Sequence, residues 1–273
     1  MAAVGEKIDP KSGSRSSRAF LLQLRRLAPL LSLVALLLLW QLITSAEIYP
    51  AFIVPPPAAV GRAFIEALQS GLLLKHLAVT LEEMFLGLIL GLGIGLSIGY
   101  AIAKAPILEY TLSPVIVAFQ STPIVAYAPL LVIWFGSGPT SKIVTTAVIV
   151  FFPSLVNTIV AVRAVSPNLR DLMTSLNATP WQTFRQLELP SALPVVLAGL
   201  KTSATLAVIG AVVGEFVTQG SGLGYLVTSA RNQYDTPLVI VTVLTMTAIA
   251  LSLYSFVVLL EWRWLAWRRR SKG

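Results

Sequence analysis

Few side chains in this sequence have the chemistry of a catalyst. The 273 residues include no cysteine and one histidine, His76, so neither thiolate ligands nor a multi-histidine metal centre can form. An intramembrane serine protease needs a serine and a histidine together inside the membrane, whereas we expect His76 to be solvated or interfacial. The sequence has no Gly-x-x-x-x-Gly-Lys-Ser/Thr segment, so it carries no P-loop for ATP. We therefore expect no catalytic residue, metal or cofactor in this chain.

Polar residues instead interrupt long apolar stretches. At such places they would contact a solute that crosses the membrane rather than catalyse a reaction. They are Gln120, Ser121 and Thr122, followed by Pro123, in one stretch and Asn157 in another. Lipid cannot satisfy amide and backbone groups, so these residues must face protein or a wet cavity. They either belong to proline-kinked structural helices or line a translocation path. Glu215, at the end of a further apolar stretch, is either solvated or borders the external mouth of that path.

The elements that carry these residues are membrane helices. Hydrophobic residues make up 56% of the chain and charged residues 12%, and the mean hydropathy is +0.80, whereas a soluble domain is about 45–50% apolar and about 25% charged. A spanning helix needs about 20 apolar residues. Apolar runs of that length predict an all-α integral membrane protein with six transmembrane helices, at 27–46, 84–103, within 110–135, and at 143–162, 193–214 and 236–260. Lys201 interrupts the fifth run, and its side chain either reaches the membrane interface or has an ion-pairing or coupling role.

The basic residues orient these helices. Fifteen lysines and arginines lie on one side of the membrane, in the N-terminal arm, the loop between the second and third spans, the loop between the fourth and fifth spans, and the C-terminal tail. Four lie on the opposite side. The positive-inside rule therefore predicts that both termini are cytoplasmic. The net charge of +8 is spread over loops and tails, which does not indicate nucleic-acid binding.

The same patterns divide the chain into segments. We expect a disordered basic arm at 1–26, the first helix at 27–46, an external segment with an amphipathic helix at 47–76, a five-helix domain at 77–260 and a basic tail at 261–273. Within the second helix, glycines recur every four residues and predict a smooth face for close helix packing. They are Gly87, Gly91, Gly95 and Gly99.

The loop at 164–190 is far longer than a turn requires. Ser166 followed by Pro167 is a typical helix start, and Thr179 with Gln182 predicts a capping box for a second short helix. We expect a bend near Asn177 and an end to the second helix before Pro190, because the residue before a proline avoids helical geometry. One face of the first helix is apolar, through Leu169, Leu172, Met173 and Leu176. Such a protruding pair of helices predicts docking to a cytoplasmic partner.

Residues 171–190 resemble the coupling loop of bacterial ABC-importer permeases of type I. Asp171 takes the acidic position of the family pattern and Pro190 the proline, whereas Leu172 and Met173 replace two alanines and Asn177 replaces a glycine. Asparagine tolerates left-handed backbone better than most residues, so the bend can be kept. Further motifs of this branch occur at 120–123, 128–131, 133–136, 151–153, 192–194, 199–201 and 214–224.

The resemblance implies the type I permease fold in a bacterial inner membrane. It implies an ATPase-coupling role for Asp171, Ser175, Asn177, Ala178, Trp181, Leu187 and Pro190. The implied partners are two separate ATPase subunits, which bind ATP and magnesium, an external solute-binding protein, a second permease copy and membrane lipid. The segment 210–217 with 235–237 looks nearest the riboflavin and pyrimidine-precursor permeases. Sulfonate, taurine or nitrate are the alternative solutes, and an ion-coupled secondary transporter is the alternative class, although that would bury ionisable groups near the midplane.

Overall fold

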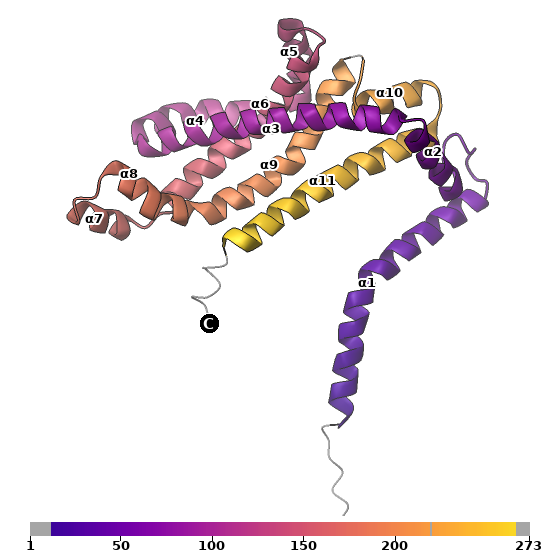
Figure 1. Cartoon of the computed structure of the whole chain (residues 1–273), viewed down its shortest axis with the longest axis horizontal. Coiled ribbons are helices and arrows are strands. Elements are labelled where there is room, and N and C mark those ends of the chain that lie inside the picture. The colour runs from indigo at the N-terminus through magenta and orange to yellow at the C-terminus, as the bar shows by residue number, and fades with distance from the viewer. Residues whose placement is uncertain (1–11, 219, 266–273) are drawn as a thin grey trace, which may run out of the picture. The chain divides into compact units, whose positions relative to one another are not determined.

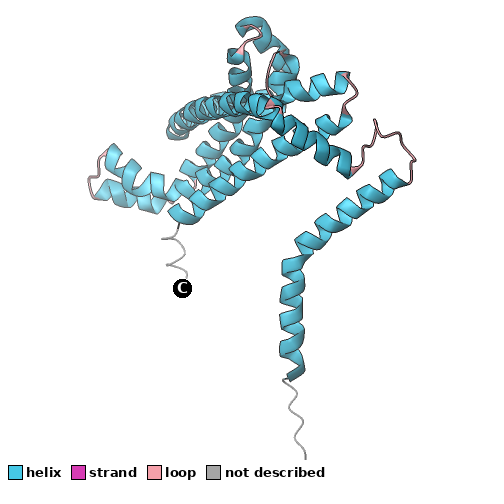
Figure 2. Cartoon of the chain, turned by 45° about the vertical axis from the view of Figure 1, so that its right-hand side comes forward, coloured by secondary structure: helices cyan, strands magenta, loops and turns pink. Residues whose placement is uncertain are grey.

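The computed structural model describes residues 12–218 and 220–265. This part of the chain is helical and contains no strand (Figures 1 and 2), which confirms the all-α class. The helices are α1 (Ser12–Ser45), α2 (Pro57–Gln69), α3 (Leu72–Lys104), α4 (Pro106–Ser121), α5 (Ala128–Phe135), α6 (Pro139–Arg163), α7 (Pro167–Ser175), α8 (Pro180–Thr183), α9 (Leu189–Val217), α10 (Leu223–Asn232) and α11 (Thr236–Trp264), with a 3-10 turn at Ile124–Ala126 and a π-turn at Phe184–Glu188. The chain forms two compact units, Met1–Arg62 and Ala63–Gly273.

The first unit contains α1. This helix begins at Ser12, so residues 12–26 are helical where a disordered arm was expected, and residues 1–11 lie outside the described residues. The difference has a local cause, because leucine, glutamine and arginine at 21–26 are good helix formers that run on into the apolar stretch. That apolar stretch is Leu30–Ser45. Within this stretch, Trp40 Nε1 donates a hydrogen bond to the carbonyl of Pro55, which follows the helix, at 3.0 Å.

Four helices of the second unit are long and apolar enough to cross a membrane, among the residues that the structure describes. They are Leu72–Lys104, Pro139–Arg163, Pro180–Val217 and Thr236–Trp264, and they match the second, fourth, fifth and sixth predicted spans. The third predicted span is divided into α4, the 3-10 turn and α5. The break falls at Thr122, which is extended because it precedes Pro123. The six-span count is thus not confirmed by helix length alone.

The predicted glycine face joins α3 to α6. A Cβ added to Gly91 would lie 2.5 Å from the carbonyl oxygen of Ala147, and one added to Gly99 would lie 2.6 Å from that of Leu155. Because the contact moves eight residues forward on both helices, from Gly91 and Ala147 to Gly99 and Leu155, α3 and α6 run parallel to each other. On the other flank of α6, a Cβ on Gly210 of α9 would lie 2.7 Å from the Cα of Thr146. Glycines on two neighbours therefore bring both backbones close to α6.

This packing gives a testable prediction. Gly91→Ala should destabilise the protein by about 1–3 kcal/mol, because the new methyl meets backbone that cannot yield without moving α3. Gly93→Ala is the matched control: nothing lies within 4 Å of its added Cβ, so it should be neutral or gain up to about 1 kcal/mol of helix propensity. Thermal unfolding in detergent measures both variants. Equal stability of the two would contradict the close packing.

The helices α7 and α8 lie at one end of this bundle and α10 lies at the other (Figure 1). The capping box of Thr179 and Gln182 is confirmed, with both hydrogen bonds present. The bend is also confirmed, since Asn177 has φ 52°. The predicted end of the second helix before Pro190 is wrong, because α8 continues through the π-turn into α9. The wider π-turn, in which the Leu189 N–H reaches the carbonyl of Phe184, accommodates a proline that would clash in an ordinary α-helix.

Candidate functional site

A buried ion pair lies at the α10 end of the bundle. Lys142 of α6 is 2.9 Å from Glu83 of α3, and both side chains are almost fully buried. The Lys142 ammonium also donates to the backbone carbonyl of Ser221 at 2.9 Å. A buried charge is tolerated only where it is paired and hydrogen-bonded, and Lys142 satisfies both conditions.

Glu215 lies in the same cluster. Its carboxylate is buried and accepts hydrogen bonds of 2.5 Å from the Thr80 hydroxyl and from the Gly224 N–H. Gly222 has φ 113°, and a Cβ there would collide with the Glu215 carboxyl group. Glu215 is therefore enclosed by protein in this chain and holds the connection between α9 and α10.

His76 completes this cluster, and its predicted solvated position is wrong. The side chain is only 6% exposed, its Nδ1 accepts a hydrogen bond from the Gly222 N–H at 3.1 Å, and its ring stacks on Tyr225 with centroids 5.8 Å apart. The reason is that α3 begins at Leu72 rather than near residue 84, which carries His76 into the helix bundle. The Leu223 N–H is likewise bound, by the Thr80 oxygen at 2.7 Å.

The polar break between α4 and α5 lies elsewhere. Gln120 is exposed, and its Nε2 reaches the carbonyl of Phe152 at 3.5 Å, whereas Ser121 and Thr122 donate to carbonyls of their own helix. Asn157 is half-buried on α6 and borders Gly199 of α9. The residues predicted for a translocation path therefore occupy three places in this chain, namely the exposed break at Gln120–Pro123, the α6–α9 contact and the buried cluster.

An aromatic hollow lies beside that break. It has a volume of about 340 Å³ and is lined by Phe119, Tyr127, Leu130, Leu131, Trp134, Val148, Phe151 and Phe152. Five of these eight side chains are aromatic, against 9% of the whole chain. The rings of Phe119 and Phe152 are stacked at 5.7 Å with an interplanar angle of 15°. Flat ring faces and no polar lining would suit a planar aromatic group.

At the opposite end, α7 and α8 expose apolar side chains to their surroundings. The exposed fraction is 67% for Leu176 and 65% for Trp181, and Leu169 and Leu172 are also exposed. We call this surface the knob. The predicted coupling residues lie on or beneath it: Asp171, Ser175, Asn177 and Trp181 are exposed, Ala178 and Pro190 are half-buried, and Leu187 is buried.

Lys201 is 2.5 Å from Glu261 of α11, so an ion pair is the alternative that the structure favours for this lysine.

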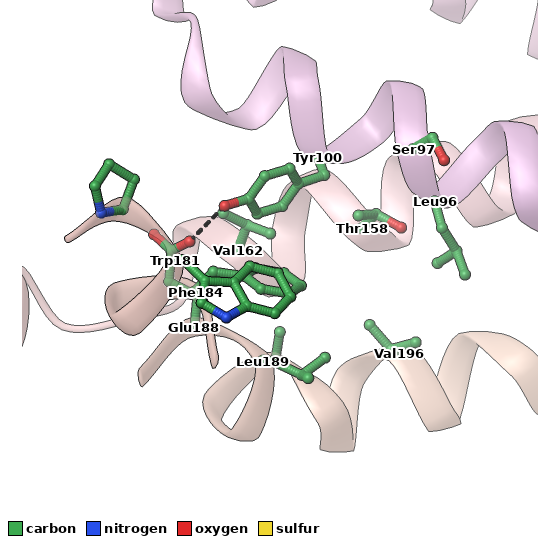
Figure 3. A pocket seen from close by; sticks show the side chains of 12 residues that line it. Leu96, Ser97, Tyr100, Thr158, Val162, Trp181, Phe184, Glu188, Leu189 and Val196 are labelled. Atoms are coloured by element: carbon green, nitrogen blue, oxygen red, sulfur yellow. Dashed lines mark hydrogen bonds between the residues drawn. The ribbon is translucent and has the colours of Figure 1, made fainter. Parts of the chain in front are cut away.

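Glu188, beneath the knob, is 1% exposed and borders a second cavity, of about 610 Å³, together with Tyr100, Trp181 and Phe184 (Figure 3). Glu188 was overlooked in the sequence analysis, although an acidic residue between two leucines and close to a proline is a visible signal.

These features define a class: a helical membrane protein with several helices long and apolar enough to span the bilayer. Residues 87–265 match the family described as binding-protein-dependent transport system inner membrane component. The chain belongs to that family and is a permease of the ABC-importer class.

Named relatives and a solved structure agree with this assignment. The riboflavin transport system permease protein RibX of Chloroflexus aurantiacus is 47% identical, over 86% of this chain and 88% of that protein. The putative aliphatic sulfonates transport permease protein SsuC of Bacillus subtilis is 32% identical, over 86% and 85%. The crystal structure of an amino acid ABC transporter shares the fold, with a TM-score of 0.56 and 19% identity, over 73% of this chain and 98% of that one.

Proposed function

We propose that this chain is the membrane-spanning subunit of an importer driven by separate ATPase subunits. Two copies form the path, an external binding protein delivers the solute, and the knob receives the ATPases. The observation that carries this proposal is the knob itself, because apolar side chains as exposed as Leu176 and Trp181 on a loop between spans indicate a docking partner. The sorting of basic residues supports six spans with both termini in the cytoplasm of a bacterial cell.

The solute proposed is riboflavin or a related vitamin precursor. The 47% identity to a riboflavin permease supports it, and so does the aromatic hollow, whose ring faces suit a planar heteroaromatic group. Gln120, next to the hollow, would offer amide hydrogen bonds to the polar edge of such a ring. An aliphatic sulfonate has neither a planar ring nor a polar ring edge, although a relative named for aliphatic sulfonates is 32% identical.

Uptake into proteoliposomes tests the function. The chain is reconstituted with its ATPase subunit and binding protein. Labelled riboflavin or labelled taurine is then added on the side of the membrane where the binding protein lies. We expect ATP-dependent riboflavin accumulation that is insensitive to collapse of the ion gradients. Accumulation that follows the proton gradient without ATP would establish a secondary transporter instead, and ATP-driven uptake of taurine alone would replace the solute.

The aromatic hollow gives a second prediction. Phe119→Leu together with Phe152→Leu should lower riboflavin uptake about tenfold, since stacking of a planar base on aromatic side chains contributes about 1–3 kcal/mol per base. Phe85→Leu is the control, because this phenylalanine is similarly exposed on α3 but does not line the hollow. Initial uptake rates at equal protein level are compared. Unchanged uptake in the double variant would exclude the hollow from the path.

A further inference from the structure

The helix α3 ends beside the knob although the sequence does not connect them. The knob is covalently attached to α6 on one side and to α9 on the other. Lys104, the last residue of α3, lies 84 positions from Glu188, yet its ammonium donates a hydrogen bond to the Glu188 carboxylate. Tyr100, one turn earlier, donates its hydroxyl to the same carboxylate at 2.8 Å (Figure 3).

The same carboxylate also faces α7, and through it α6. Arg170 of α7 brings its guanidinium to 3.8 Å from Glu188 Oε1 and donates to the carbonyl of Val162, near the end of α6, at 2.6 Å. One buried side chain at the start of α9 therefore pairs with groups of α3 and α7, and Arg170 extends the link to α6. Burying a carboxylate is costly even when it is paired, so its value here is that it fixes four elements in one geometry.

Ring contacts form a second link at the same place. Tyr100 packs edge-on against Phe184, with centroids 5.3 Å apart and an interplanar angle of 77°, and Phe184 stacks on Trp181 of α8 at 5.6 Å. Phe184 and Glu188 are the first and last residues of the π-turn. A π-turn has a weaker hydrogen-bond ladder than an α-helix and often marks a functional site. The knob is thus held to α3 by side chains where its own connection to α9 is irregular.

We propose that Glu188 is the positioning residue that makes α3 move together with the knob. A push on the knob then reaches α3 as well as the covalently attached α6 and α9, so three spanning helices tilt as one body. Without Glu188, the push would be absorbed at the π-turn and beside the adjacent cavity. This inference rests on the proposed function, because the push comes from the ATPase subunits.

The first test is a ratio of two activities. In the reconstituted importer, Glu188→Gln should leave ATP hydrolysis within about twofold of wild type and lower the solute transported per ATP about tenfold. The control is Glu261→Gln, which breaks the Lys201 pair on α9 and α11 without touching the knob and should keep the wild-type ratio. Tyr100→Phe with Lys104→Met removes the donors of α3 while Glu188 stays, and it should reproduce the loss if Glu188→Gln does not fold.

The second test measures movement, which a merely stabilising role would not alter. The chain has no cysteine, so Ala101→Cys on α3 and Asn168→Cys on α7, both exposed, can each carry a spin label. In complexes diluted with unlabelled chain, the distance between the labels should stay constant between the nucleotide-free and ATP-bound states of wild type, and change or broaden in Glu188→Gln. A wild-type distance that changes with ATP, or an unaltered transport ratio in both variants, would overturn the inference. Absence of ATP-dependent uptake in wild type would instead refute the proposed function.

Discussion

A permease that carries Asp171→Lys together with Ala178→Glu should reach the membrane at the wild-type level and transport no measurable solute. Asp171 is exposed on α7 and Ala178 is half-buried just after the bend at Asn177. Neither residue is in the buried core, so the substitutions should change the free energy of unfolding by no more than about 0.5 kcal/mol. Their effect falls on the docked state. Misplaced charge in a buried interface costs about 2–5 kcal/mol, enough to remove most of the complex.

The comparison needs a variant with the same change in charge elsewhere. Glu66→Lys with Gln69→Glu alters two exposed residues of α2 by the same amounts and should transport normally. Membrane level by immunoblot, retention of the ATPase subunit on the purified chain and initial uptake rate are measured for both. Normal uptake with Asp171→Lys and Ala178→Glu would remove the knob from the coupling mechanism.

The features that the sequence predicted correctly are those set by neighbours in the chain. The capping box needs only Thr179 and Gln182, three residues apart, and the bend needs one residue that accepts positive φ, which Asn177 supplies. The glycine face was visible because a four-residue repeat maps directly onto one side of a helix. In each case the geometry is decided within one or two turns.

The features that it missed depend on contacts between distant segments. The Thr80–Glu215 hydrogen bond joins residues 135 positions apart, and the His76–Gly222 bond joins residues 146 apart. Whether His76 or Glu215 faces solvent, lipid or protein depends on helix rotation, which an apolar run does not specify. Pro190 shows the remaining difficulty. The residue before a proline usually avoids helical geometry, but a π-turn relaxes this restriction, and no simple sequence pattern predicts a π-turn.

The buried cluster at the α10 end leads to the largest expected effect on stability. Lys142→Met keeps most of the side-chain length but removes the cation that faces Glu83, leaving Glu83 and Glu215 buried with no positive partner from α6. Breaking a buried pair by removing one member costs about 3–5 kcal/mol, and here the carbonyl of Ser221 also loses its donor. Lys75→Met, at an exposed position of α3, is the control and should be nearly neutral.

The double variant Glu83→Gln with Lys142→Met separates the lost pair from the lost packing. If the cost of Lys142→Met comes from an unpaired carboxylate, neutralising Glu83 should restore part of the stability, and the two substitutions will not be additive. Thermal unfolding in detergent, at equal protein and lipid, is measured for the wild type, Glu83→Gln, Lys142→Met and the double variant. Additive losses would mean that the lysine acts through its length and its bond to Ser221 alone. The ion pair would then contribute nothing to holding α3, α6 and the α9–α10 connection together.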